Sequence, residues 1–236
     1  WAGLALDEKE ELLYISTGNG KLKVFNVNSG EQFAEFPSQG SKDELGQFYS
    51  SPTVYGDWVF VASYQDKKSG CGPSGEDGKS PGCGRIYGLK WRGEGDDRVL
   101  HREWVFPPTR EEAVGAFIGR PTVKDDILVV GSSDKNIYAI NVAENGKLEW
   151  DFKKAEAKIW STPTIDNGVV YFGSLDHSLY AVNLANGKYL WSFSAKGAIT
   201  SRPVVSNGTL YFGSLDKRIY ALDTKNNGKK LVDFQG

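Results

Sequence analysis

Short runs of alternating apolar and polar residues, rich in β-branched and aromatic side chains, follow one another along most of the chain. In the stretch 159–193 these runs lie at residues 162–165, 169–174, 178–183 and 188–193. A period of two is typical of strands that bury one face, and such pleated surfaces favour β-branched and aromatic residues. The pattern predicts β-strands, and no run with a helical period separates them.

Asn-Gly pairs stand at the joints between these runs. Two copies of the pattern carry them at Asn167-Gly168, Asn186-Gly187, Asn207-Gly208 and Asn227-Gly228. Both central residues of a type I′ hairpin turn need a positive φ, which Asn and Gly tolerate best. We therefore expect tight hairpins that join neighbouring strands antiparallel.

Together the strands and turns form a unit of about forty residues that repeats along the chain. The copies are residues 1–36, 49–106, 118–152, 159–193 and 199–234, of which the first is the least regular. Four short strands per copy at this period predict an all-β fold, a β-propeller of four-stranded antiparallel blades. We expect the five blades to form a single domain over residues 1–236, with an inserted loop at 65–84.

Four motifs recur in a fixed order within a copy: Gly-Ser-x-Asp, Leu/Ile-Tyr-Ala, Asn-Gly-Lys and Leu-Trp-x-Phe. In these motifs the chain resembles the pyrroloquinoline-quinone-like (PQQ-like) β-propeller repeat family, over nearly its whole length outside the loops and most clearly in blades three to five. Members of that family usually have seven or eight blades. Five copies are therefore either part of a longer propeller or a small closed ring, and the sequence leaves both open.

The resemblance also implies a structural role for a Trp in the fourth strand, which docks on a Gly-bearing turn of an adjacent blade. Blades two to four hold this residue as Trp104, Trp150 and Trp191, whereas Ala34 and Val232 fill the position in blades one and five. The expected turn partners are Gly146 and Gly187. A Trp wedge of this kind buries about 150–250 Å² and stabilises the fold by several kcal/mol.

Composition narrows the classes of partner. The chain has 236 residues and a formal net charge of −2. A balanced charge without a basic run argues against nucleic acid as a partner. There is no apolar stretch of the length that crosses a bilayer, so no membrane span is expected.

The two cysteines, Cys71 and Cys83, bracket a glycine-rich segment within the inserted loop. A disulfide between them would stabilise the loop by about 3 kcal/mol in the chain-entropy model and would imply an oxidising compartment. The alternative is a pair of free surface thiols in a cytosolic loop.

Three long loops are candidates for binding, at residues 37–47, 65–84 and 107–116. They follow second or fourth strands of blades one and two, which end on the same face of a propeller. Elaborated loops on a rigid scaffold commonly carry binding, so we expect one contiguous patch for a protein partner. The alternative is that these loops are tolerated insertions without a function.

A second candidate is the central channel, which the first strands of a propeller line. Side chains expected to point there include Tyr49, Arg120, Trp160 and Arg202, and Tyr64 is a further candidate binding residue. Arg120 and Arg202 would form a positive collar able to hold a small anionic ligand. Arginines that bridge blades or lie in solvent are the alternative explanation.

Motifs for catalysis or metal binding lack the context they need. Gly70–Gly75 fits G-x-G-x-x-G but no helix follows it, and the two histidines, His101 and His177, do not indicate a metal site or a catalytic triad. Asp134, Asp176 and Asp216 recur at one turn position, where aspartates usually bond their own backbone. We expect no catalytic residue, no metal and no cofactor.

These observations favour a non-catalytic binding or scaffold propeller that is periplasmic, on the cell surface or otherwise extracytoplasmic. Two alternatives remain: a fragment of a quinoprotein dehydrogenase and a carbohydrate-active propeller. The resemblance leads one to look for adjacent cysteines beneath a quinone, but Cys71 and Cys83 are far apart in sequence. Adjacent carboxylates such as Glu111-Glu112 point opposite ways along a strand and make a poor catalytic pair.

Overall fold

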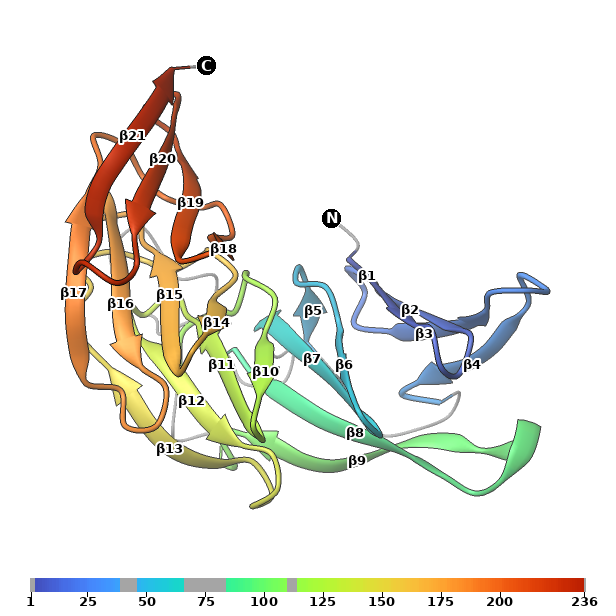
Figure 1. Ribbon diagram of the computed structural model, residues 1–236. Helices are drawn as coiled ribbons and strands as arrows, with labels where there is room; N and C mark the ends of the chain where they lie inside the picture. Colours follow the sequence, from blue (N-terminus) through green and yellow to red (C-terminus); the bar gives the residue numbers. More distant parts are fainter. Residues whose placement is uncertain (1–2, 39–45, 66–83, 110–113, 236) are drawn as a thin grey trace. The chain divides into compact units, whose positions relative to one another are not determined.

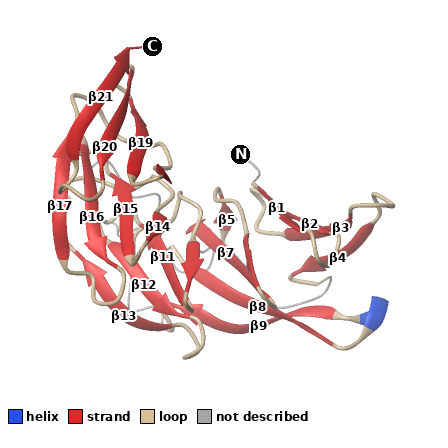
Figure 2. Ribbon diagram, in the orientation of Figure 1, coloured by secondary structure: helices blue, strands red, loops and turns tan. Residues whose placement is uncertain are grey.

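The computed structural model describes residues 3–38, 46–65, 84–109 and 114–235, and in these the chain is built of β-strands (Figure 1). Five antiparallel sheets are formed, and the helical structure within the described ranges is one short 3₁₀ turn, η1 (Gly95–Asp97), at the tip of a hairpin (Figure 2). The prediction of an all-β fold made of four-stranded blades is confirmed. None of the described helical structure is long and apolar enough to cross a membrane.

Each sheet is one repeat, and its strands pair in chain order. Blade one contains β1 (Leu4–Asp7), β2 (Leu12–Ser16), β3 (Leu22–Asn26) and β4 (Gln32–Phe36). Blade two contains β5 (Gln47–Phe48), β6 (Thr53–Tyr55), β7 (Trp58–Gln65), β8 (Ile86–Arg92) and β9 (Val99–Phe106); β5 and β6 both pair with β7, so the first strand is split. This sequential pairing is the up-and-down blade that the repeat predicts.

The remaining three blades are more regular. Blade three contains β10 (Thr122–Lys124), β11 (Ile127–Gly131), β12 (Ile137–Asn141) and β13 (Lys147–Phe152). Blade four contains β14 (Thr164–Asp166), β15 (Val169–Gly173), β16 (Ser178–Asn183) and β17 (Tyr189–Ser194). Blade five contains β18 (Val204–Ser206), β19 (Thr209–Ser214), β20 (Arg218–Asp223) and β21 (Lys229–Gln235).

The contacts divide the chain into two compact units. The first unit is Trp1–Pro121 together with the turn Val142–Lys147, and the second is Thr122–Asn141 together with Leu148–Gly236. Blades one and two lie in the first unit. The second unit contains the strands of blades three to five, apart from the first residue of β13, and within it the first strands β10, β14 and β18 are neighbours in that order.

Three of the four predicted Asn-Gly pairs have a positive φ at both residues, and two of these three are the expected two-residue turns; Asn227 and Gly228 (48° and 71°) lie in a longer connection between β20 and β21. Asn167 and Gly168 have φ values of 46° and 73°, and Asn207 and Gly208 have 50° and 76°, so both pairs are two-residue loops of the I′ kind. The prediction is wrong at Asn186, which is not among the residues with positive φ. There the Asn183 N–H donates to the Lys188 carbonyl and the Gly187 N–H donates to the Asn183 carbonyl (both 2.9 Å), so the connection has four residues and Gly187 takes the positive φ without Asn186.

The strand bounds differ from the sequence pattern in two further ways. Blade one has a first strand, β1, that the alternation did not reveal, because Leu4 and Leu6 are exposed and only Ala5 between them is buried. In blade four the first and last strands begin one or two residues later than expected, at Thr164 and Tyr189. The apolar alternation marks the region of a strand but not the residue at which its pairing starts.

The core of each unit lies between successive sheets. In the first unit Tyr14 and Leu22 of blade one pack with Phe48, Val61 and Leu89 of blade two. In the second unit, one cluster joins blades three and four and another joins blades four and five.

Blades four and five show how a sheet face is buried by the following blade. On the face of blade four that packs against blade five, Tyr171 and Leu179 are 3% and 0% exposed. Their counterparts in blade five, Tyr211 and Ile219, are 40% and 52% exposed. The same positions are therefore core in one blade and surface in the next.

Candidate functional site

The roots of two long loops meet at one end of blade two. Residues 65–84 follow β7 and residues 107–116 follow β9, and the described ends of these segments bond to each other. The Gly84 N–H donates to the Val114 carbonyl (3.2 Å). A Cβ at Gly84 would lie 2.2 Å from the Gly115 carbonyl oxygen, so a larger residue could not approach this closely. The two loops therefore leave the blade side by side.

Arg85 adds hydrogen bonds to this junction of the two loop roots. Its side chain is buried, and its guanidinium donates to the carbonyls of Pro107 (2.5 Å) and Thr109 (3.1 Å). The Arg85 N–H donates to Ser63 Oγ (3.0 Å), which connects the same residue to β7. A buried arginine is stable only when its donors are satisfied, and here the backbone of the second loop supplies the acceptors. The sequence analysis missed Arg85, although its place directly after the insert was a usable signal.

Tyr49 and Tyr64, two of the predicted binding residues, lie together at this end of blade two. Their ring centroids are 5.0 Å apart in an edge-to-face arrangement, and Tyr49 is 38% exposed. Tyr64 immediately precedes the loop 65–84. Half-exposed tyrosines on a rigid strand are common anchors of protein interfaces. We call Tyr49, Tyr64, Gly84, Arg85 and Val114 the loop-root cluster.

Parts of the predicted patch fall outside the described residues. Cys71 and Cys83 both do, as do the interiors of the loops 37–47, 65–84 and 107–116. The loop 37–47 begins in blade one, where Lys21 Nζ donates to the Pro37 carbonyl (2.8 Å), and ends at Gln47 in β5. The expected disulfide and the single binding patch therefore remain predictions.

The two arginines of the predicted collar lie in different units, and each is engaged within its own. In the first unit, Arg120 Nε donates to Thr53 Oγ1 (3.2 Å), and Thr53 Oγ1 donates to the Pro121 carbonyl (2.7 Å). In the second unit, Arg202 Nε donates to Thr164 Oγ1 (3.4 Å). These bonds match the alternative in which the arginines bridge blades, and an anionic ligand remains a prediction only.

Threonine hydroxyls form the rest of this arrangement in the second unit. Thr164 Oγ1 donates to the Pro203 carbonyl, and Thr122 Oγ1 donates to the Pro163 carbonyl (2.7 Å). Each bond runs from the first strand of one blade to the proline before the first strand of the next. Trp160, the remaining channel candidate, is 37% exposed and donates from Nε1 to Ser133 Oγ (3.1 Å).

The fourth-strand tryptophans lie against turn glycines. In the second unit, a Cβ at Gly187 would lie 2.6 Å from Cε3 of Trp150, and a Cβ at Gly228 would lie 2.4 Å from Cζ3 of Trp191. Both indoles are buried, and Trp150 Nε1 donates to the Leu184 carbonyl (2.7 Å). Each tryptophan thus uses the hairpin turn of the blade that follows its own.

Within the first unit, Trp104 makes the equivalent contact with Gly146. A Cβ at Gly146 would lie 2.4 Å from Cε3 of Trp104. Trp104 also covers Gly88, its partner on the neighbouring strand β8, where a Cβ would lie 2.2 Å from Cε2 of the indole. The sequence had named Gly146 and Gly187 without assigning a tryptophan to each, and it had not named Gly228.

The recurring turn aspartates are held by hydrogen bonds. Asp176 accepts from the Ser178 N–H (2.9 Å), the Tyr180 hydroxyl (2.8 Å) and the Glu156 N–H (2.8 Å). Asp216 repeats the arrangement: burial raises the pKa of its carboxyl, but hydrogen bonds from the Tyr220 hydroxyl and from backbone N–H groups outweigh burial and hold that pKa below its usual value. These aspartates connect a turn to the segment that enters the blade.

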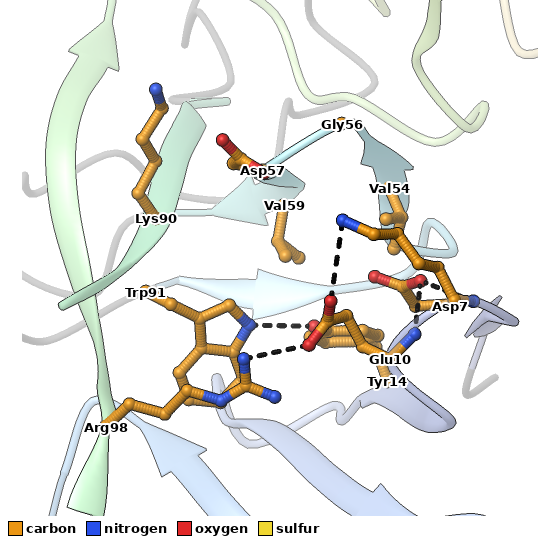
Figure 3. A pocket seen from close by; sticks show the side chains of 11 residues that line it. Asp7, Glu10, Tyr14, Val54, Gly56, Asp57, Val59, Lys90, Trp91 and Arg98 are labelled. Atoms are coloured by element: carbon orange, nitrogen blue, oxygen red, sulfur yellow. Dashed lines mark hydrogen bonds and ion pairs between the residues drawn. The ribbon is translucent and has the colours of Figure 1, made fainter. Parts of the chain in front are cut away.

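A pocket of about 380 Å³ opens between blades one and two (Figure 3). Along the strands of blade two it lies at the end opposite to the loop-root cluster. It lies by the turn after β1, the turn after β6 and the hairpin that joins β8 to β9, whereas the long loops follow β4, β7 and β9. The lining residues are Asp7, Lys9, Glu10, Tyr14, Val54, Gly56, Asp57, Val59, Lys90, Trp91 and Arg98. The sequence analysis named none of them as site residues.

One wall of the pocket is a network that joins the two blades. The Trp91 Nε1–H donates to the Tyr14 hydroxyl (3.0 Å), and Arg98 forms an ion pair with Glu10 (Nη1 to Oε2, 3.0 Å). The Arg98 guanidinium also lies over the rings of Trp91 (4.9 Å) and Phe33 (5.3 Å). Burial raises the pKa of the Tyr14 hydroxyl to about 12, so Tyr14 is neutral at physiological pH.

The contact between Arg98 and Glu10 affects the ionisation of the groups in this wall. The hydrogen bond from Arg98 holds the pKa of the Glu10 carboxyl below its usual range. The buried Nε of Arg98 has no hydrogen-bond partner in the described part of the chain, and an unmet donor costs about 1–3 kcal/mol. Arg98 therefore lies in the wall of the pocket although its unmet Nε donor is unfavourable for stability.

Comparison with known proteins assigns the chain to a family. The family model described as "Outer membrane protein assembly factor BamB" matches residues 104–233, which is more than half of the chain. Among solved structures, BamB from Moraxella catarrhalis matches with a TM-score of 0.70 and 18% sequence identity, over 98% of this chain and 60% of that one. This chain thus spans 60% of the length of that protein. A search of the curated proteins found no match.

Proposed function

Because the chain belongs to the PQQ-like propeller family described as outer membrane protein assembly factor BamB, we propose that it is a non-catalytic, protein-binding scaffold. The compartment we propose is periplasmic, cell-surface or otherwise extracytoplasmic. The family is described as an assembly factor, and a role in assembly supports binding to other proteins in place of conversion of a substrate. The fold match over 98% of the chain supports the same class of protein.

The observation that carries the proposal is the loop-root cluster. Two long loops start from roots that bond to each other, and two half-exposed tyrosines stand beside them. A broad surface of loops and aromatic anchors fits a protein partner better than a small molecule, which needs a closed pocket. We propose that residues 37–47, 65–84 and 107–116 complete this surface.

Two further features belong to the same proposal. A disulfide between Cys71 and Cys83 would restrict the glycine-rich loop before binding and so reduce the entropy lost on association. The five blades would act as one domain over residues 1–236, which holds the loops at fixed positions. We propose no cofactor, because this role requires none.

The experiment compares the intact chain with a variant that lacks residues 67–82, which removes one loop of the surface. A photoreactive amino acid placed at Tyr49 should give a cross-linked adduct with a partner in the native cell envelope. The same group placed at Lys188, an exposed residue of the second unit that is not part of the proposed surface, is the matched control and should give none.

Deletion of residues 67–82 should abolish the Tyr49 adduct and leave the melting temperature within a few degrees of the intact chain. An adduct that survives the deletion, or that forms equally at Lys188, would place the partner elsewhere. Unfolding of the deletion variant would show instead that the loop is structural. In that case the single substitution Tyr64→Ala, which keeps the photoreactive group at position 49, tests the surface.

A further inference from the structure

One face of blade five presents large apolar side chains that are exposed. They stand in two adjacent rows across the sheet, Val204, Tyr211 and Val232 in one row and Ile219 and Phe234 in the other. Paired residues share a face, and so do residues two apart along a strand, so all five belong to one face. Their exposed fractions lie between 40% and 55%. We call these five residues the blade-five face.

In blades three and four the corresponding face is covered by the next blade through two specific contacts. The first-strand threonines Thr122 and Thr164 each donate to the carbonyl of the proline that precedes the first strand of the next blade. The fourth-strand tryptophans Trp150 and Trp191 each lie against a turn glycine of the next blade. In blade four the threonine and the tryptophan stand at the two ends of one row across the sheet.

Blade five has neither of these residues. Val204 stands at the threonine position, because it pairs with Tyr211 as Thr164 pairs with Tyr171. Val232 stands at the tryptophan position, at the other end of the same row. A valine has no hydroxyl to donate and no ring to insert into a turn. The blade-five face therefore lacks the residues that hold a regular following blade.

Blade one shows that the covering element differs where these residues are absent. Its row has Ala5 and Ala34 at the two positions. Blade two, which covers it, joins its last two strands by the long hairpin of β8, η1 and β9 and not by a short glycine turn, and this hairpin brings Trp91 to the Tyr14 hydroxyl (3.0 Å). The absence of the two residues thus accompanies a partner without the regular turn, and we expect the same at blade five.

The area of the blade-five face suits a contact between two copies of the chain. With about half of each side chain exposed, the five residues present on the order of 500 Å² of apolar surface. Two such faces would bury about 1,000 Å², and homodimer interfaces are about 65% apolar, so the whole contact would cover about 1,500 Å². Stable interfaces cover about 1,200–2,000 Å² in total, so this contact is large enough.

The charges beside the face also allow it to meet itself. The row beyond Tyr211 is polar and contains one acid and one base, Asp223 and Lys229, which pair across β20 and β21. In a symmetric contact the same patch supplies both sides, so an excess of one charge would be opposed by its own copy. This row has no such excess. An apolar centre with a balanced polar border is the usual anatomy of an interface between two copies.

We propose that the chain forms a symmetric dimer in which the blade-five face of one copy packs on the blade-five face of the other. Ile219 and Phe234, half exposed in one copy, become buried between two sheets. Val204 and Val232 keep the face flat, so that the sheets approach to about 10 Å as in other sheet-on-sheet contacts. The inference does not rest on the proposed function, since the loop-root cluster takes no part in this contact.

The test is sedimentation velocity of the full chain from low to high micromolar concentration, where a shift to twice the mass of the chain is expected. Ile219→Lys places a charge in the contact twice, once from each copy, and should raise the dissociation constant of the dimer about 100-fold or more. Leu148→Lys is the matched control, since Leu148 is 40% exposed on β13 and lies outside the face. It should leave the dissociation constant unchanged. Both variants replace exposed side chains, so circular dichroism should show them folded.

A cross-link identifies the face independently of these variants. A photoreactive amino acid at Tyr211 should give a covalent dimer of the purified chain. The same group at Lys188 of blade four should give none.

Val232→Trp separates the symmetric dimer from a head-to-tail contact. The indole would stand between two flat faces and should weaken the symmetric dimer about tenfold or more. A partner with an open glycine turn would instead bind this variant more tightly. Blade one has such a turn at Gly30 (φ 73°), where a Cβ would meet nothing within 4 Å.

Four outcomes would overturn the proposal. They are a native chain that stays monomeric at every concentration, an Ile219→Lys variant that dimerises as the native chain does, a covalent dimer that forms equally from Lys188, and a Val232→Trp variant that associates more tightly and beyond the dimer. The last would show a head-to-tail contact with the Gly30 turn. None of these outcomes bears on the Tyr49 adduct, which forms with a partner in the cell envelope, so the two proposals fail separately.

Discussion

Replacing Gly187 by alanine tests the idea that each tryptophan wedge requires a glycine in the following turn. A Cβ there would lie 2.6 Å from Cε3 of Trp150, a separation that forces the indole to move. Gly168 is the matched control, because its φ of 73° is close to the 67° of Gly187 but a Cβ at Gly168 would meet nothing within 4 Å. The cost of a left-handed alanine, about 1 kcal/mol, is therefore common to both variants.

The difference between the two variants isolates the packing of Trp150. Overpacking a close-packed site costs about 1–3 kcal/mol. Movement of the indole would also weaken the bond from Trp150 Nε1 to the Leu184 carbonyl (2.7 Å), a loss of about 1 kcal/mol. We expect Gly187→Ala to lower the free energy of unfolding by about 2–4 kcal/mol more than Gly168→Ala does.

The assay is urea unfolding followed by tryptophan fluorescence and circular dichroism, with a double-mutant cycle. Trp150→Ala alone should cost about 3–5 kcal/mol. In that background the steric conflict is absent, so Gly187→Ala should cost no more than Gly168→Ala. Equal effects of the two glycine substitutions in the native background, or an undiminished effect in the Trp150→Ala background, would refute the wedge argument.

Three further predictions follow from individual bonds. Burial raises the pKa of the Tyr220 hydroxyl to about 12, above the ordinary value of 10.0. The stability that the protonated hydroxyl adds is therefore complete below pH 10 and is lost as the pH rises towards 12. Absorbance titration at alkaline pH measures this pKa, and Tyr220→Phe should remove the corresponding dependence of stability on pH. The hydrogen bond from Arg98 lowers the pKa of Glu10 below 4.5, so the stability that this bond adds is present above pH 4.5 and is lost as the pH falls through the lowered pKa. The melting temperature should therefore change less between about pH 3 and 6 in Glu10→Gln than in the native chain. Equal changes in the two proteins would contradict the pairing. Thr164→Val removes the hydroxyl bonded to the Pro203 carbonyl and should cost about 1–2 kcal/mol in thermal unfolding; a stability equal to that of the native chain would show that the bond is dispensable.

The fold could be predicted from the sequence because its signals are local. Alternation between Val169 and Gly173 and the pair Asn167-Gly168 specify a strand and a hairpin without reference to the rest of the chain. At Asn186 the same dipeptide lies in a four-residue connection between β16 and β17, and the length of that connection is a property of two paired strands. The sequence of either strand alone does not contain it.

The candidate sites were harder to predict because they depend on contacts between distant segments. Arg85 bonds to carbonyls of a loop that starts more than twenty residues later, and backbone carbonyls carry no sequence signal. The pocket lies where Tyr14 of blade one meets Trp91 of blade two. Its clearest sign in the sequence is that blade one has Ala34 where other blades have a tryptophan. That absence was noted as an irregularity of a terminal copy, although the compensating Trp91 stood in the next copy.

The tryptophan contacts determine which blades of such a chain can be duplicated. The junction of blades four and five needs Trp191 from one copy and Gly228 from the next, so each regular copy carries the indole for one neighbour and the glycine for the other. A tandem duplication of blade four would therefore arrive with both halves, and the new copy would complete two junctions without any compensating substitution. Blade two could not be duplicated in this way, because its hairpin holds Trp91 where a glycine turn would have to receive an incoming indole. Regular blades can thus multiply, while the blade beside the pocket is fixed in its place.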